Sequence, residues 1–164
     1  MGYRVAIIGA TGAVGLELLR ILEERDFPVD SLRLFASERS AGKSLCFRGE
    51  TVRVETLHEG AFKGIEIAFF SAGAPRSREF APKAVQAGAL VIDNSSAFRL
   101  DPEVPLVIPE INGESMRSHK GIIANPNCSS IILLMALAPL RSLTRIKRVI
   151  VSTCLLYTSD AADE

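Results

Sequence analysis

Hydrophobic and polar positions recur along this chain with two different periods, one typical of strands and the other typical of helices. Tyr3 to Ile8 form a short, mostly apolar run that ends at Gly9, which predicts a buried strand. From Val14 to Arg25, apolar residues recur at helical spacing with glutamates between them, which predicts an amphipathic helix. The chain therefore opens with a strand followed directly by a helix.

The same alternation continues through most of the sequence. Further β-like runs are Leu32 to Ala36, Ile65 to Phe70, Leu90 to Asp93, Leu106 to Ile108, Ile122 to Ala124 and Ile146 to Thr153, and helices are expected over about Ser77 to Ala87 and Ser129 to Leu140. Leu45 to Glu55, with Gly49 at its centre, is predicted to be an inserted hairpin. Because strands alternate with helices and several strands are apolar on both faces, we expect an α/β fold with a mainly parallel sheet that is covered on both sides.

Composition narrows the class of protein. The chain has 164 residues, 48% of them hydrophobic, and a mean hydropathy of +0.23, which predicts a globular domain with a real core. Lys plus Arg and Asp plus Glu both number 19, so no basic excess favours nucleic acid. The longest apolar run, Ile131 to Leu140, is too short for a membrane span. Three unpatterned cysteines and a start without a signal sequence favour the cytoplasm, and no metal site is expected.

A glycine-rich motif, G-A-T-G-A-V-G from Gly9 to Gly15, joins the first strand to the first helix. Gly9 and Gly12 let the backbone turn tightly and approach a pyrophosphate, and Gly15 lets the helix lie close to the sheet. Such turns also occur without a ligand, but the strand before and the helix after favour a dinucleotide site. The candidate cofactor contacts in this motif are Gly9, Thr11, Gly12, Ala13 and Val14.

The segment after the second strand bears on the choice of dinucleotide. Glu38 alone would favour NAD, whereas Arg39, Ser40 and Lys43 supply donors for the 2′-phosphate of NADP, and we give the cluster more weight than the single acid. A solvated loop is the alternative interpretation. Small residues at the end of a later strand are expected to contact the nicotinamide half of the cofactor, namely Ser71, Ala72 and Gly73.

Two further polar motifs follow predicted strands. D-N-S-S-A-F-R ends in Arg99, whose planar guanidinium suits a phosphate or carboxylate, although an arginine in a loop is more often simply solvated. N-P-N-C-S-S places Cys128 where a helix is expected to begin, and the positive end of a helix favours the thiolate nucleophile. A buried, inert cysteine is the alternative, but the polar neighbours argue against it. Both histidines, His58 and His119, are expected at the surface.

Taken in this order and at these separations, the four motifs resemble the aspartate-semialdehyde dehydrogenases, and the similarity runs from about Tyr3 to Thr153. The resemblance implies a Rossmann-like, doubly wound domain over residues 1–133, NADP held by Thr11 to Val14 with Arg39 and Ser40, and Cys128 as the residue that forms an acyl-enzyme. It also implies that Arg99 and Asn127 contact the substrate or its phosphate. The full-length family member is expected to be a homodimer or homotetramer.

The similarity is lost at Cys154. Residues 134–153 are expected to begin a second, catalytic and dimerisation domain, and residues 154–164 resemble a foreign tail. The resemblance places a substrate-orienting glutamine, a general-base histidine and a carboxylate-binding arginine in sequence that is not present here. We therefore expect the chain alone to be inactive. Two alternatives remain open, N-acetyl-γ-glutamyl-phosphate reductase and a non-catalytic dinucleotide-binding fragment.

Overall fold

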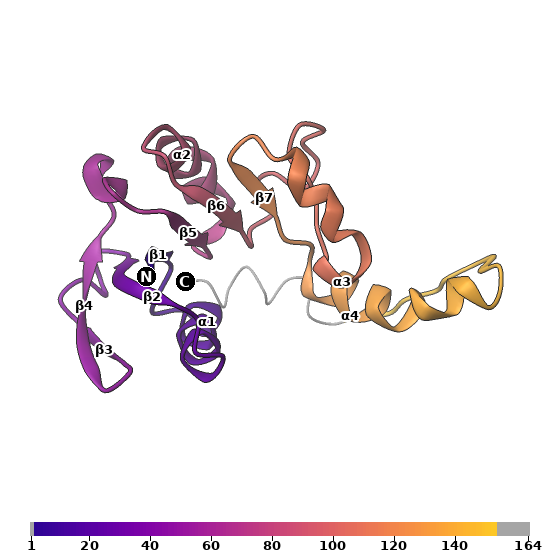
Figure 1. The fold of residues 1–164 in the computed structure, drawn as a ribbon, viewed down its shortest axis with the longest axis horizontal. Coiled ribbons are helices and arrows are strands. Elements are labelled where there is room, and N and C mark those ends of the chain that lie inside the picture. The colour runs from indigo at the N-terminus through magenta and orange to yellow at the C-terminus, as the bar shows by residue number, and fades with distance from the viewer. Residues whose placement is uncertain (1, 154–164) are drawn as a thin grey trace.

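Parallel strands dominate the sheet of this chain, which the computed structural model describes over residues 2–153 (Figure 1). Within that range seven strands lie in the order β3-β4-β2-β1-β5-β6-β7, and only β3 and β4 pair antiparallel. The strands are β1 (Tyr3–Ile8), β2 (Val29–Ala36), β3 (Ser44–Phe47), β4 (Glu50–Thr56), β5 (Ile67–Phe70), β6 (Leu90–Asp93) and β7 (Ile122–Ala124). The helices are α1 (Ala13–Glu24), α2 (Gly73–Gln86), α3 (Pro109–Asn112) and α4 (Cys128–Leu137), with 3-10 turns η1 (Glu59–Phe62), η2 (Gly113–Ser118) and η3 (Pro139–Ser142).

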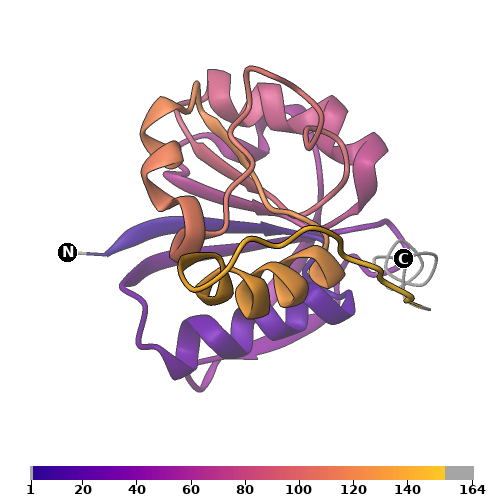
Figure 2. The ribbon, with the colours of Figure 1, turned by 90° about the vertical axis from the view of Figure 1, so that its right-hand side faces the viewer.

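The central strand β1 is buried on both faces, as its continuous apolar sequence predicts. Val5 and Ile7 belong to a core cluster that includes Leu19 and Leu22 of α1, whereas Ala6 and Ile8 belong to a second cluster that includes residues of α2. Alternate side chains of a strand point to opposite faces, so α1 and α2 cover opposite sides of the sheet (Figure 2). In the strand order, the connection through α1 leads from β1 to its neighbour β2, toward one edge of the sheet. The connection through α2 leads from β5 to β6, toward the opposite edge. This arrangement confirms the doubly wound α/β fold.

The predicted hairpin is also confirmed. Phe47 pairs with Glu50 across the turn between β3 and β4. The two residues of that turn, Arg48 and Gly49, both have positive φ, at 52° and 79°. A two-residue turn of this kind fits the right-handed twist of the flanking strands, and the hairpin adds one antiparallel strand beside β4.

Three predictions about secondary structure need correction. Helix α2 begins at Gly73, not near Ser77. Pro75 does not prevent this earlier start, because it lies in the first turn, where the N–H group that proline lacks would have no partner within the helix. The run Leu106 to Ile108 forms a single parallel bridge, Leu106 to Ala124, and is too short to be a strand. The run Ile146 to Thr153 is not a strand, because a strand needs a hydrogen-bonding partner and no described strand lies alongside it.

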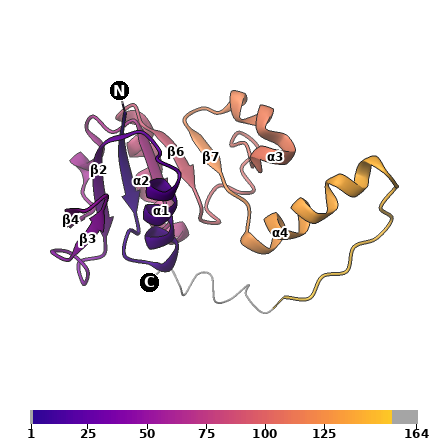
Figure 3. The same cartoon turned by 60° about the horizontal axis from the view of Figure 1, so that its bottom comes forward.

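Helix α4 differs from the other long helices in having no buried residue. Every residue of α4 is exposed or only partly buried, and Ile132 is 71% exposed. Figure 3 shows α4 leading away from the sheet and the chain that follows it turning back at the far end of the helix. The domain boundary predicted at residues 133 and 134 falls inside this helix, and residues 154–164, the predicted foreign tail, lie outside the described residues.

Candidate functional site

The segments that follow the parallel strands meet along the carboxyl edge of the sheet. Backbone N–H groups at the start of these segments donate to carbonyls at the ends of neighbouring strands at 2.8 Å: Gly9 to Phe35, Ser71 to Ile8, Asn94 to Phe70, and Asn125 to Asp93. The strand order brings the glycine motif, the small-residue segment and both later polar motifs to this one edge. Ligands of open α/β sheets bind at this edge.

The glycine motif needs glycine at two positions for reasons of space. Gly9 has a φ of +91°, and a Cβ there would lie 2.0 Å from the carbonyl oxygen of Ser71. A Cβ on Gly15 would lie 2.2 Å from the carbonyl oxygen of Gly9, so only glycine lets α1 pack this closely. Gly12 caps α1 with an ordinary φ of −75° and no side-chain hydrogen bond to the helix. The first N–H groups of α1 are therefore suited to receive an anion.

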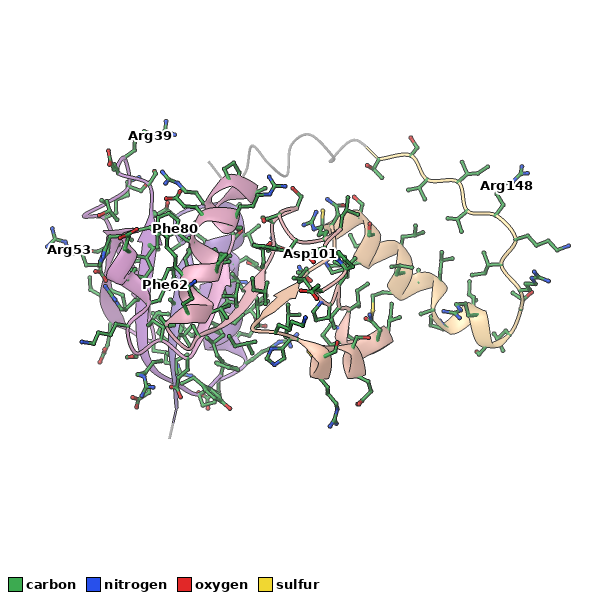
Figure 4. All side chains as sticks on the ribbon, turned by 90° about the horizontal axis from the view of Figure 1, so that it is seen from above. Arg39, Arg53, Phe62, Phe80, Asp101 and Arg148 are labelled. Atoms are coloured by element: carbon green, nitrogen blue, oxygen red, sulfur yellow. The ribbon has the colours of Figure 1, made fainter. Side chains whose placement is uncertain are left out.

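A pocket of about 280 Å³ lies over this motif. Its lining comes from the last residues of β1, β2 and β4, from the segments that follow them, and from the start of the segment after β5: Ile8, Gly9, Thr11, Gly12, Ala36, Ser37, Glu38, Arg39, Thr56, Leu57, Ala72 and Arg76. The exposed side chain of Arg39 extends outward from the ribbon beside it (Figure 4). The combination of an uncapped helix start, two arginines and a small-residue wall suits a phosphorylated dinucleotide.

The structure places the predicted cofactor residues in two groups. Five line the pocket: Gly9, Thr11, Gly12, Arg39 and Ala72. The other five lie beside it without lining it: Ala13 and Val14 in the first turn of α1, Ser40 next to Arg39, Ser71 buried after β5, and Gly73 at the start of α2. Thr56, Leu57 and Arg76 were missed, since the strand order brings them here from distant parts of the sequence. The first turn of α2 contains no acidic residue but does contain Arg76, and this unusual charge at a helix start could have drawn attention to that arginine.

An ion pair supports the β2 and β4 side of the pocket. The guanidinium of Arg33 binds Glu55 through two hydrogen bonds, Nε to Oε1 at 3.0 Å and Nη2 to Oε2 at 2.7 Å. These hydrogen bonds lower the pKa of the Glu55 carboxyl. Because Glu55 precedes the pocket residue Thr56, the pair helps to hold that wall in place.

A buried polar cluster links α2 to the polar loop after β6. The carboxylate of Asp93 is fully buried and accepts hydrogen bonds from the hydroxyls of Ser77 at 2.7 Å and Ser95 at 2.8 Å. Ser95 also accepts from the backbone N–H of Ala97 at 3.0 Å. Buried polar groups are stable only when they are paired in this way, so the cluster orders the loop that leads to Arg99.

Arg99 joins the two polar loops. Its Nε donates to the carbonyl oxygen of Asn125 at 2.9 Å, and its Nη2 donates to that of Asn94 at 2.7 Å. The side chains of Asn125 and Asn94 are also hydrogen-bonded to each other at 2.6 Å. The half-buried arginine therefore holds the segment before Cys128 against the neighbouring loop, a contact that the sequence did not reveal.

Cys128 is the first residue of α4 and is exposed to solvent. Asn127 caps the helix, with its side-chain oxygen accepting from the backbone N–H of Ser129 at 3.0 Å. The Cys128 sulfur lies 3.9 Å from the same Asn127 oxygen. The predictions that this cysteine opens a helix and is not buried are confirmed, and an exposed thiol at a helix start is suited to nucleophilic attack.

Other candidate features lie outside this edge. His58 and His119 are exposed, as expected. Among residues 2–153, no cluster of three or more His, Cys, Asp or Glu side chains could hold a metal ion. None of the helices in the same range has the length and apolar character needed to cross a membrane.

Comparison with known proteins points to one family. Residues 4–119 match the family model described as semialdehyde dehydrogenase, NAD binding domain. The chain is 59% identical over 156 residues to an aspartate-semialdehyde dehydrogenase of Aquifex aeolicus, with 93% of this chain and 46% of the relative covered. The chain thus spans less than half the length of this curated relative.

Solved structures agree in fold. The crystal structure of aspartate semialdehyde dehydrogenase II of Vibrio cholerae, complexed with ASA, matches with a TM-score of 0.83 and 51% identity, covering 87% of this chain and 47% of that one. The aspartate semialdehyde dehydrogenase of Candida albicans with NADP matches with a TM-score of 0.70 and 25% identity, covering 87% and 48%. With the family model covering most of the chain, the sheet and glycine motif described above are those of an NAD-binding domain, and the chain belongs to the semialdehyde dehydrogenase family.

Proposed function

We propose that this chain carries the cofactor site and the nucleophile of an NADP-dependent aspartate-semialdehyde dehydrogenase. One observation carries the proposal: the loop before Cys128 is hydrogen-bonded into the same sheet edge that bears the dinucleotide pocket. Neighbouring strands lie about 4.8 Å apart, so β7 lies about three strand spacings, roughly 14 Å, from β1. An extended dinucleotide can bridge that distance, with its phosphates at α1 and its reactive ring toward Cys128.

In the biosynthetic direction, the thiolate of Cys128 attacks the acyl carbon of 4-phospho-L-aspartate. The carbon–oxygen bond to the phosphate breaks, phosphate leaves with that electron pair, and a thioester to Cys128 remains. NADPH, when bound, supplies the hydride that converts the thioester to L-aspartate 4-semialdehyde. The start of α4 stabilises negative charge on the sulfur when it leaves, and Asn127 keeps that helix start in place.

We assign the substrate phosphate to Arg99 and Asn127. Two of the five guanidinium N–H groups of Arg99 are engaged with backbone carbonyls, and this holds the side chain rigidly beside the loop of Cys128. The remaining donors can then bind an anion without first losing conformational freedom. Rigid placement is what a phosphate site next to a nucleophile requires.

The choice of NADP follows from the charges at the pocket. Arg39 and Ser40 follow β2, where a dinucleotide presents its adenosine ribose, and the Candida albicans relative was solved with NADP. Residues 134–153 would begin a second domain that covers the exposed apolar side chains of α4 and forms the contacts of a homodimer or homotetramer. We also assign the enzyme to the cytoplasm.

The cofactor part of the proposal is tested by calorimetric titration of the chain with NADP and NAD. NADP should bind more tightly by about tenfold or more, and Arg39→Ala should remove much of that preference, because a charge-assisted hydrogen bond contributes about 1.5–3 kcal/mol. Equal affinities of the unaltered chain for the two cofactors would contradict the assignment.

The nucleophile is tested by alkylation with iodoacetamide near neutral pH, with the modified cysteines mapped by mass spectrometry. Cys46 is the internal control, since it is also exposed but lies on a strand. Cys128 should react faster, because it opens a helix. Faster labelling of Cys46 would refute the assignment. We expect no appreciable NADPH formation from the 164-residue chain alone, and robust turnover would refute the need for a second domain.

A further inference from the structure

The pocket over the glycine motif has arginines on two sides. β1 lies between β2 and β5 in the sheet, so the segment after β2 and the start of α2, which follows β5, flank the glycine motif from opposite directions. Arg39 comes from the first of these segments and Arg76 from the second. A ligand in this pocket would therefore meet a guanidinium from each side.

The charge balance of the pocket depends on both arginines. Its charged lining residues within the described part of the chain are Glu38, Arg39 and Arg76. With Arg39 alone the carboxylate of Glu38 would cancel the positive charge, and a 2′-phosphate carrying nearly two negative charges would gain little. With Arg76 the lining has a net charge of +1. The second arginine is what makes the pocket electrostatically favourable for a phosphate.

The position of Arg76 within α2 also points to an anion. It is the fourth residue of the helix, and the first turn contains no acidic residue. A positive side chain near a helix N-terminus is unfavourable because the positive end of the helix dipole lies there. Arg76 is paired only weakly with Glu79. The Nη1 atom of Arg76 lies 3.6 Å from Oε2 of Glu79, which is too long for a hydrogen bond, and both side chains are exposed. A bound phosphate would offset the repulsion.

Resting on the proposed function, we infer that Arg76 is a second specificity-determining residue of the cofactor site, which binds the 2′-phosphate of NADP together with Arg39. The preference for NADP then has two sources, one on each side of the pocket. Arg39 and Arg76 neutralise the phosphate jointly, and Glu38 remains as the group that a bare ribose hydroxyl would contact.

The experiment is a calorimetric titration of the 164-residue chain and its variants with NADP and, separately, with NAD. Arg76→Ala should weaken NADP binding about tenfold and change NAD binding by less than about two-fold. Arg78→Ala is the matched control: Arg78 lies two residues further along the same helix and is exposed, but is not among the described residues that line the pocket. It should leave both affinities within about two-fold.

Further variants separate the possible outcomes. Arg76→Lys, which keeps the charge but loses the planar donor set, should show an intermediate loss, and circular dichroism of each variant checks that the fold is retained. An equal loss of NADP and NAD affinity in Arg76→Ala would overturn the inference in favour of a pyrophosphate contact. So would an effect no larger than that of Arg78→Ala. If the unaltered chain bound neither cofactor, the proposed function itself would fail.

Discussion

Gly9→Ala is predicted to destabilise the chain strongly because the glycine motif leaves no room for a methyl group. The new Cβ would lie 2.0 Å from the Ser71 carbonyl oxygen, about 1 Å short of the 3.0 Å below which real Cβ contacts essentially never occur. The three nearest atoms, from Ser71 and Ala72, all belong to the backbone, so relief requires the ends of β1 and β5 to separate. That movement would weaken the hydrogen bond from the Ser71 N–H to the Ile8 carbonyl, now 2.8 Å long.

The magnitude follows from two terms. Holding alanine at a φ of +91° costs about 1–2 kcal/mol, and loss of one buried backbone hydrogen bond costs about 1 kcal/mol or more. We therefore expect the free energy of unfolding to fall by about 3 kcal/mol, a large share of the stability of a domain this size.

Gly49→Ala separates the two terms. Gly49 also has a positive φ, +79°, but a Cβ there would meet no atom within 4 Å, so only the backbone strain of about 1–2 kcal/mol applies. Urea unfolding followed by circular dichroism gives the free energy of unfolding of both variants by linear extrapolation. If Gly9→Ala lost no more stability than Gly49→Ala, the close approach of β1 and β5 would not be the reason for this glycine.

Two further predictions concern charge and the exposed helix. Hydrogen bonds from Arg33 lower the pKa of Glu55 below its usual 4.5, so the ionised pair stabilises the fold above that pH, and this contribution is lost as the pH falls through the lowered pKa. Glu55→Gln should therefore reduce the free energy of unfolding near neutral pH by about 0.5–1 kcal/mol, since the pair is partly exposed. In strong acid the difference from the unaltered chain should vanish. Thermal unfolding at both pH values checks this, and an equal difference at both would contradict it. The apolar surface of α4 should bind a hydrophobic dye and promote association, and Ile132→Glu should reduce both effects; light scattering showing a monodisperse monomer, with no dye binding, would count against the prediction.

Much of the central fold could be predicted from local patterns in the sequence. The buried run before Gly9, the helical spacing after it and the succession of further strands and helices are sufficient for a doubly wound α/β sheet. The glycine motif and the helix-opening Cys128 were also predictable, because their chemistry depends on neighbouring residues: glycine permits the tight turn, and Asn127 caps the helix that Cys128 begins.

Contacts between distant segments were decided by the tertiary structure. Arg76 enters the pocket from a helix that the sequence pattern started too late, and Arg99 reaches the carbonyl oxygen of Asn125, 26 residues away. The run Ile146 to Thr153 has the composition of a strand, but a strand forms only where a partner provides hydrogen bonds, and none of the described strands does so. Local spacing determines how each segment folds, whereas the order of strands in the sheet determines which residues meet at its edge.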